Sequence, residues 1–142
     1  MSSAEQFGII GEIEEDGYTV IYSLDNYIPK QEVVNYYPTL VVIKWAFDGS
    51  KNSGMPSKEL QNKMYLADGL FNELVESGAS FRAYTRTGNN LREYAYYCID
   101  QSSYLDALNQ AAKKYPKFPI DIVFYEDSEW TDYKSLISAF EG

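Results

Sequence analysis

The segment Thr39–Phe47 constrains the fold more than any other part of the sequence. Its residues are apolar at both parities of a strand: Leu40 and Val42 at one, and Val41, Ile43 and Trp45 at the other. Apolar side chains on both faces are typical of a strand in the middle of a sheet that is covered from both sides. We therefore expect this segment to be a central strand.

The residues before this strand predict a hairpin. Phe7–Glu14 alternates loosely, and Tyr18–Leu24 is rich in β-branched and aromatic residues. Asp16-Gly17 stands between the two segments, and Asp-Gly is a strong signal for a tight turn between strands. Asp25–Pro38, which contains two prolines, is expected to be irregular.

Two apolar stripes with helical spacing follow the central strand. Ser57 can cap the first helix, and Gly78 is a suitable terminator for it. A second helix is expected to begin near Ser103 and to end before Pro116. Between and after these helices the pattern predicts three strands and a short terminal helix: Ala79–Arg86, Leu91–Ile99, a strand around 120–124, and a helix around 130–140.

The order of these elements predicts one α+β domain over residues 1–142. Without the first hairpin and the terminal helix, the remaining order is β-α-β-β-α-β, which is that of the ferredoxin-like, or split βαβ, arrangement. We expect an antiparallel sheet with both long helices on one face, an added N-terminal hairpin and a short C-terminal helix. The other face is exposed, covered by one of the two additions, or used for binding.

The composition excludes much catalytic chemistry. The 142 residues include no histidine and a single cysteine, Cys98. The commonest general base and metal ligand is therefore missing, and neither an internal disulfide nor a cysteine zinc cluster can form. Cys98 lies in a predicted strand, which favours a buried structural thiol. We expect no catalytic residue, no metal and no cofactor.

The charge balance bears on partners and location. The net charge of -9 repels a phosphate backbone, so nucleic-acid binding is disfavoured. The acid excess lies in the two flanks of the chain, and the middle is nearly neutral. The polar segment Met1–Gln6 does not resemble a secretory signal, and no apolar stretch is long enough to cross a membrane. These features predict a soluble, cytoplasmic protein without membrane contact.

Two local patterns have an ordinary explanation that we prefer. Gly49–Gly54 has the glycine spacing of a phosphate-binding loop, but Met55 and Pro56 replace the required lysine and hydroxyl residue. The acids Glu126, Asp127, Glu129 and Asp132 could bind Ca²⁺ or Mg²⁺, although their spacing is not that of an EF-hand. Acids at the start of a helix stabilise its positive end, and we favour this interpretation.

Arginine and tyrosine alternate along two neighbouring predicted strands. One trio is Arg82, Tyr84 and Arg86, and the other is Arg92, Tyr94 and Tyr96. A register that pairs Tyr84 with Tyr94 places both trios on one face, whereas a shift of one residue separates them.

We favour the joined register because it also collects four apolar residues on the helix side: Phe81, Ala83, Ala95 and Tyr97. The six-residue face is then interpreted as sheet packing first, protein contact second and RNA stacking third.

The C-terminal half resembles a known family. The residues that carry the resemblance are Thr85-Arg86-Thr87-Gly88, Arg92-Glu93-Tyr94, Tyr96-Tyr97, Tyr104, Tyr115-Pro116 and Glu126-Asp127-Ser128-Glu129-Trp130, with Tyr133 and Leu136. Over roughly residues 80–137 they resemble the bacterial family catalogued as domain of unknown function 695. The turn from Gly88 to Leu91 is longer than in that family. The resemblance implies no activity and no catalytic residues, and a terminal helix that packs on the domain explains the Trp130 pattern equally well.

A more distant similarity is to regulator of ribonuclease E activity B, an acidic ferredoxin-like inhibitor. This similarity implies a small protein-binding regulator. We therefore expect a non-enzymatic regulatory, inhibitor or immunity-type module that contacts another protein, with a basic protein as one candidate and a homodimer left open. The acidic flanks would speed encounter with such a partner. The alternative is a carboxylate-based enzyme or a small-ligand-binding protein.

Overall fold

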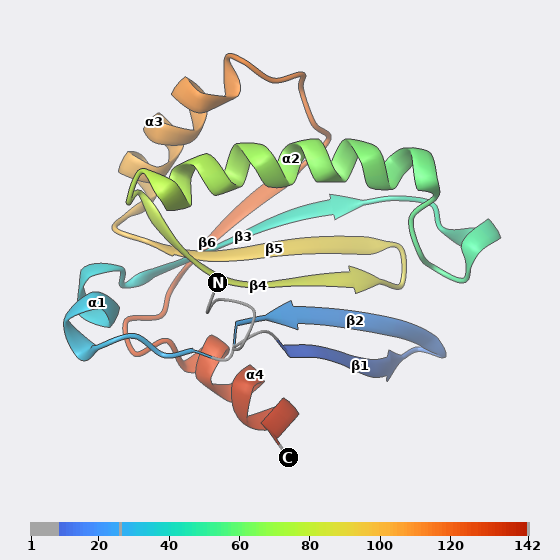
Figure 1. The fold of residues 1–142 in the computed structure, drawn as a ribbon, viewed down its shortest axis with the longest axis horizontal. Helices are drawn as coiled ribbons and strands as arrows, with labels where there is room; N and C mark the ends of the chain where they lie inside the picture. Colours follow the sequence, from blue (N-terminus) through green and yellow to red (C-terminus); the bar gives the residue numbers. More distant parts are fainter. Residues whose placement is uncertain (1–8, 26, 142) are drawn as a thin grey trace, which may run out of the picture.

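The computed structural model describes residues 9–25 and 27–141, which form one six-stranded sheet with helices on both sides (Figure 1). The strands lie in the order β1-β2-β4-β5-β3-β6, and every neighbouring pair is antiparallel. Their bounds are β1 Ile9–Glu15, β2 Tyr18–Leu24, β3 Thr39–Ala46, β4 Ser80–Gly88, β5 Leu91–Cys98 and β6 Asp121–Glu126. The helices are α1 Gln31–Tyr36, α2 Lys58–Glu76, α3 Gln101–Ala112 and α4 Thr131–Glu141, with a short 3₁₀ turn, η2, at Ser50–Asn52. The predicted α+β class with an antiparallel sheet is confirmed.

The N-terminal hairpin extends the sheet at one edge. β1 and β2 meet at Asp16 and Gly17, whose φ angles of 53° and 84° are those of a tight hairpin turn. β2 then pairs with β4. The predicted hairpin is confirmed, although Phe7 and Gly8 lie outside the described residues.

β3 is the central strand that its sequence predicts. It lies between β5 and β6, and its odd-numbered residues Val41, Ile43 and Trp45 belong to a core cluster beneath α2 and α3. Leu40 and Val42 belong to a second cluster on the opposite face. Both faces of β3 are therefore used in packing.

α2 and α3 form the layer on one face. The side chain of Ser57 accepts a hydrogen bond from the Leu60 N–H at 3.1 Å, and Gly78 ends α2 with a φ angle of 87°, both as predicted. α3 begins earlier than expected, because Asp100 caps it by accepting from the Ser103 N–H at 2.7 Å. Among the helices of the described residues, none combines the length and the apolar character that crossing a membrane requires.

α1 and α4 lie on the other face (Figure 1). The expectation of an irregular segment over 25–38 is wrong in part, because α1 forms there and buries Val34. α4 is the predicted terminal helix, and Tyr133 and Ile137 are buried against the sheet. These two helices cover part of this face and leave the part over β3 and β6 open, as described below.

The β4–β5 register differs from the favoured one. Arg82 pairs with Tyr96, but Tyr84 pairs with Ala95 because a β-bulge lies between Arg82 and Tyr84. The predicted pairing of Tyr84 with Tyr94 is therefore wrong. A bulge adds one residue to a strand and reverses the alternation of the side chains beyond it.

The bulge separates the predicted trios. Arg82 lies on the α2 side with Arg92 and Tyr96, whereas Tyr84 and Arg86 lie on the opposite side. Four other residues come together as expected, but against α4 rather than α2: Phe81, Ala83, Ala95 and Tyr97.

Candidate functional site

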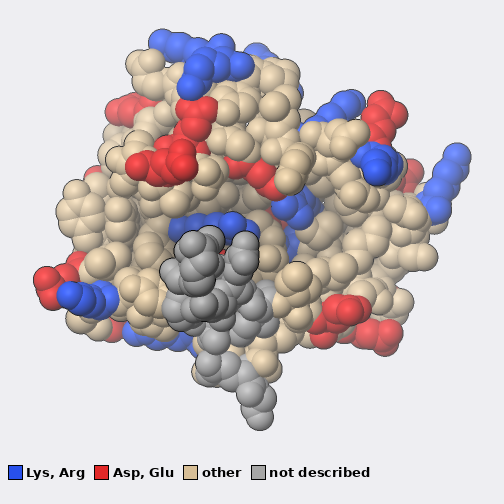
Figure 2. Space-filling view, viewed as in Figure 1, with Lys and Arg blue, Asp and Glu red and all other residues tan. Residues whose placement is uncertain are grey.

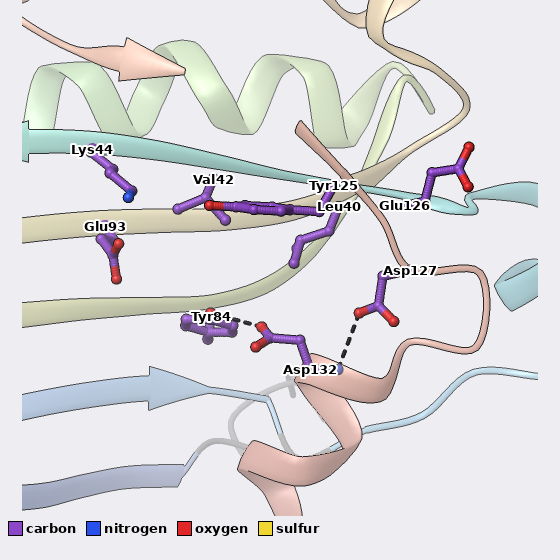
Figure 3. A pocket seen from close by; sticks show the side chains of 9 residues that line it. All are labelled: Leu40, Val42, Lys44, Tyr84, Glu93, Tyr125, Glu126, Asp127 and Asp132. Carbon is purple, nitrogen blue, oxygen red and sulfur yellow. Dashed lines mark hydrogen bonds between the residues drawn. The ribbon is translucent and has the colours of Figure 1, made fainter. Parts of the chain in front are cut away.

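An open stretch of the sheet beside α4 forms a groove (Figure 3). We call it the acidic groove, and the residues that line it are Leu40, Val42, Lys44, Tyr84, Glu93, Tyr125, Glu126, Asp127 and Asp132. They come from β3, β4, β5, β6 and the first turn of α4 with the segment before it. Tyr84 is the one predicted binding residue among them.

The floor of the acidic groove is apolar. Leu40 and Val42 point into it from β3 and are 5% and 6% exposed. Tyr125 stands opposite Leu40 in the β3–β6 register, is 46% exposed, and has its ring laid across the groove (Figure 3). The exposed aromatic ring, lying beside these nearly buried apolar residues, offers contact area to a partner.

The rim of the acidic groove carries an excess of negative charge. Lys44 and Glu93, which are neighbours in the β3–β5 register, lie at one end, and Asp127 and Asp132 lie at the other (Figure 3). Glu126 is a fourth acid of the lining, but its side chain points away from the groove (Figure 3), so three carboxylates and one base face the groove. None of the ion pairs between described residues involves Lys44. The groove therefore favours a positively charged occupant.

Asp127 has a structural role at the rim. Its carboxylate accepts hydrogen bonds from the N–H groups of Thr131 at 2.8 Å and Asp132 at 3.1 Å, and from the Tyr97 hydroxyl at 2.7 Å. It thus caps the start of α4, which agrees with the favoured interpretation of the acidic segment. Within the described part of the chain, no three acidic or thiol side chains are grouped so that they could hold a metal ion.

Tyr84 joins the wall of the acidic groove to α4. Its hydroxyl donates a hydrogen bond to Oδ2 of Asp132 at 2.8 Å. Burial, and next the negative charge of Asp132, raise the pKa of Tyr84 far above its ordinary value. The hydroxyl therefore remains a hydrogen-bond donor at neutral pH, and it holds the Asp132 carboxylate at the rim.

Three other predicted residues line a separate hollow between α2 and β4: Arg82, Arg92 and Tyr96. Arg92 is held there by an ion pair with Asp68 at 3.3 Å and lies 4.7 Å from the centre of the Tyr94 ring. Tyr94 is fully buried and, like Tyr96, packs on Phe71. Burial raises the pKa of both tyrosines. These contacts agree with sheet packing, and a binding role for these residues stays a prediction.

Arg86 is buried in the β4–β5 turn. It is 4% exposed and donates hydrogen bonds to the carbonyl oxygens of Gly88 at 2.9 Å and Leu91 at 3.0 Å. Its Nη2 also lies 2.7 Å from Oε1 of Glu15 in the first hairpin. Arg86 therefore connects two neighbouring hairpins.

Comparison with known proteins gives one match. A family model described as a family of unknown function (DUF695) matches residues 13–137, which run from β1 into α4 and include the acidic groove. The chain belongs to the DUF695 family. No curated protein and no solved structure matches it. The predicted family is confirmed for this DUF695 chain, and the similarity to regulator of ribonuclease E activity B stays a prediction.

The C-terminal motif of this DUF695 chain anchors α4. The Trp130 ring is stacked on Tyr97, with centroids 4.3 Å apart and planes 10° from parallel. Its Nε1 donates to the Tyr37 carbonyl oxygen at 2.8 Å, and Tyr133 is fully buried nearby. Packing of the terminal helix on the domain therefore accounts for these motif residues.

The sequence analysis missed most of the acidic groove. Lys44 carried a usable signal, because it is the one charged residue in an apolar strand and shares the parity of Leu40 and Val42. A charged side chain at that parity indicates that this end of the strand face is open to water. Glu93 carried no comparable signal, because its place beside Lys44 depends on the β3–β5 pairing.

Proposed function

We propose that this DUF695 chain is a non-enzymatic protein-binding module that holds a basic segment of another protein in the acidic groove. The observation that carries the proposal is a groove in which the exposed ring of Tyr125 lies over apolar residues of β3, beneath a rim with three carboxylates and one base. A regulatory or inhibitory role fits a domain that presents such a surface. The lone thiol agrees with a cytoplasmic setting.

The floor and the rim of the acidic groove would contribute to such a complex in different ways. The exposed ring of Tyr125 supplies most of the apolar contact area, and the nearly buried Leu40 and Val42 form the apolar surface beneath it. The acids steer a positively charged partner towards the groove and set its orientation. In Figure 2, Lys and Arg side chains gather at the top of the view, over the end of α3 and the loop that follows it. That layer lies on the other side of the sheet from the acidic groove, so these side chains do not neutralise it.

The fold supports the same class of protein. β4, β5, β3 and β6 lie in that order with α2 and α3 on one face, and we infer from this a ferredoxin-like core with a hairpin added beside β4. Folds of this kind serve many functions, so the proposal depends on the groove and not on the fold.

The alternative function needs a carboxyl group in an apolar hollow. Asp68 comes nearest, because burial raises its pKa despite the opposing charge of Arg92. The Arg92 guanidinium lies 3.3 Å from it, so the Asp68 carboxylate is a partner in an ion pair between α2 and β5. We therefore prefer protein binding to carboxylate catalysis.

A peptide of alternating lysine and valine tests the proposal. The double variant Glu93→Gln/Asp132→Asn removes two rim charges and keeps the side-chain shapes. We expect it to bind the peptide with a dissociation constant raised roughly 2- to 30-fold, because the contacts of the partly exposed Glu93 and the exposed Asp132 contribute about 0.4–2 kcal/mol together. Isothermal titration calorimetry at low and moderate salt measures the effect, and thermal unfolding checks the fold.

A matched control removes two charges elsewhere. Glu59→Gln/Asp106→Asn neutralises two exposed acids on α2 and α3 and is expected to bind like the unaltered chain. A peptide of alternating glutamate and valine is expected not to bind. Equal affinity of both double variants for the lysine–valine peptide, or no measurable binding of that peptide to the unaltered chain, would refute the proposed function.

A further inference from the structure

We propose that the basic segment binds as an additional antiparallel strand on the free edge of β6, beside the acidic groove. This inference rests on the proposed function and specifies how the partner is held. β6 is the last strand of the sheet and pairs with β3 alone among the described strands. An edge strand offers unpaired N–H and C=O groups that another chain can use.

The register shows which backbone groups of β6 face outwards. The Asp127 N–H donates to the Pro38 carbonyl oxygen at 3.0 Å, so residues 127 and 38 are a hydrogen-bonding pair. Such pairs recur at every second residue of an antiparallel ladder. Tyr125 and Val123 therefore direct their backbone groups towards β3, and Ile122, Phe124 and Glu126 direct theirs towards the free edge.

An independent hydrogen bond on the other side of β3 supports this assignment. The Phe47 N–H donates to the Asn90 carbonyl oxygen at 3.0 Å, in register with the β3–β5 pairing. Odd-numbered residues of β3 therefore face β5, and even-numbered ones face β6. The β3–β5 and β3–β6 hydrogen bonds therefore agree on which backbone groups face which strand. The backbone N–H and C=O groups of Ile122, Phe124 and Glu126 face the free edge, where no described strand pairs with them.

β6 lacks the usual protection of an edge strand. Its sequence Asp-Ile-Val-Phe-Tyr-Glu contains no proline, glycine or lysine, and four of its six residues are β-branched or aromatic. Its register with β3 runs without a shift. Proline, lysine and bulges are the features that commonly prevent pairing at an edge. The negative charges of Asp121 and Glu126 at the two ends of β6 repel an acidic segment and attract a basic one.

The two faces of β6 specify the side chains of the partner strand. Asp121 stands opposite Lys44, so it lies on the same face as the acidic groove, with Val123 and Tyr125. Ile122 and Phe124 lie on the α3 side and pack against the first core cluster. A strand added beside β6 therefore suits both faces of the sheet when its side chains alternate. Basic side chains then lie on the groove side, and apolar side chains lie on the α3 side.

A second copy of this chain fits the edge poorly. Two copies would bring together two net charges of -9. A symmetric pairing of two β6 edges centred on Phe124 would in addition place Asp121 of each copy opposite Asp127 of the other. Like charges directly opposite one another destabilise a sheet. The charge pattern therefore favours a basic segment of a different protein.

Backbone methylation of the lysine–valine peptide tests strand addition. In an antiparallel complex the valine residues stand opposite Ile122, Phe124 and Glu126, so their N–H groups face β6. N-methylation of the valine amides is expected to weaken binding about tenfold or more, because those N–H groups can no longer donate. N-methylation of the lysine amides, which face solvent, leaves the affinity within about threefold and serves as the matched control.

A pair of protein variants tests the same edge. Glu126→Pro removes an outward N–H at a position where an edge strand tolerates proline, and Glu126→Ala removes the same carboxylate but keeps the N–H. We expect Glu126→Pro to bind the lysine–valine peptide at least about fivefold more weakly than Glu126→Ala. Far-UV circular dichroism and thermal unfolding verify that both variants are folded.

The outcomes separate this inference from the proposed function. Binding that survives valine methylation and Glu126→Pro but is weakened by Glu93→Gln/Asp132→Asn overturns strand addition and leaves the acidic groove as the site. Loss of binding on lysine methylation alone overturns the antiparallel orientation. Binding that is insensitive to the rim variant overturns the proposed function itself.

Discussion

Arg86 shows how one buried charge organises several backbone segments. Its guanidinium group satisfies two carbonyl oxygens of the β4–β5 turn and pairs with Glu15 of the β1–β2 hairpin. A planar group with five donors can serve all of these acceptors, which lysine cannot. Glu15 is also hydrogen-bonded by the Asn89 side chain at 3.0 Å. The hydrogen bond from Asn89, and next that from Arg86, hold the pKa of Glu15 below its ordinary value.

The lowered pKa predicts a pH-dependent effect of Glu15→Gln. The carboxylate stabilises the folded chain above its ordinary pKa, and this contribution is lost as the pH falls through the lower folded pKa. Because the Glu15 side chain is 39% exposed, we expect the variant to lose only about 0.5–1 kcal/mol at neutral pH and almost nothing near pH 3. Urea unfolding at both pH values measures this difference.

Glu14→Gln is the control for this prediction. Glu14 is an exposed neighbour on the same strand, and its substitution is expected to change the free energy of unfolding by less than about 0.5 kcal/mol. A Glu15→Gln deficit that stays the same at both pH values would contradict the role given to this carboxylate.

At the scale of elements, α4 is held by its first turn. Trp130 has a φ angle of 57°, which a bulky residue adopts only where its surroundings enforce it. Stacking on Tyr97 and the hydrogen bond to Tyr37 supply those surroundings, and Asp127 caps the helix beside it. The largest contacts of α4 therefore lie at its N-terminal end, and Ile137 and Phe140 continue the packing towards its C-terminal end.

Trp130→Ala is expected to cost about 3–5 kcal/mol of unfolding free energy, because it empties a fully buried site. In hydrogen-exchange measurements on this variant, the backbone amides of α4 should exchange faster than those of β3. Tyr65→Ala is the control, since Tyr65 is 79% exposed and its loss should cost less than about 0.5 kcal/mol. A cost below about 1 kcal/mol for Trp130→Ala would show that α4 is anchored elsewhere.

Elements with a regular pattern could be predicted from the sequence, and irregular ones could not. The caps at Ser57 and Gly78 and the two-faced strand β3 depend on local chemistry, so they were found. The bulge between Arg82 and Tyr84 has no local signal, because it depends on which residues of β5 stand opposite. α1 is only six residues long and buries one side chain, Val34, which is too little for a periodic pattern.

For the same reason the candidate site was found only in part. Tyr84 is a predicted site residue because it alternates with arginine in β4, yet it faces the acidic groove and not Arg92 of β5. The apolar floor at Leu40 and Val42 was predicted as core, which it is, but its open end depends on how far α4 extends over the sheet. Such coverage is a property of tertiary packing.

At the scale of the whole molecule, one sheet separates two apolar cores. The core beneath α2 and α3 contains Cys98, which is fully buried, and burial raises the pKa of this thiol to about 12. The other core contains Trp130 and Tyr97. Because β3 and β5 contribute to both cores, we expect the two to unfold together.

Cys98 reports on that cooperativity. At pH 8 the folded chain should react with a thiol reagent at least about a hundredfold more slowly than the chain in urea, because only opening exposes the thiolate. The labelling rate should rise with urea in step with global unfolding. Ser102→Cys/Cys98→Ala, with its thiol on an exposed position of α3, should react rapidly in the folded state. Rapid labelling of native Cys98 would show a local opening of this core.

The bulge in β4 makes the number of residues between Arg82 and Tyr84 critical for the rest of the strand. Phe81 and Ala83 face one core, and beyond the bulge Tyr84 faces the same side. Removing a single amino acid between Arg82 and Tyr84 would move every later side chain of β4 to the opposite face of the sheet. The Arg86 side chain would then no longer reach the carbonyl oxygens to which it donates. The length of this stretch is therefore constrained as strictly as the identity of its buried residues Ala83 and Arg86.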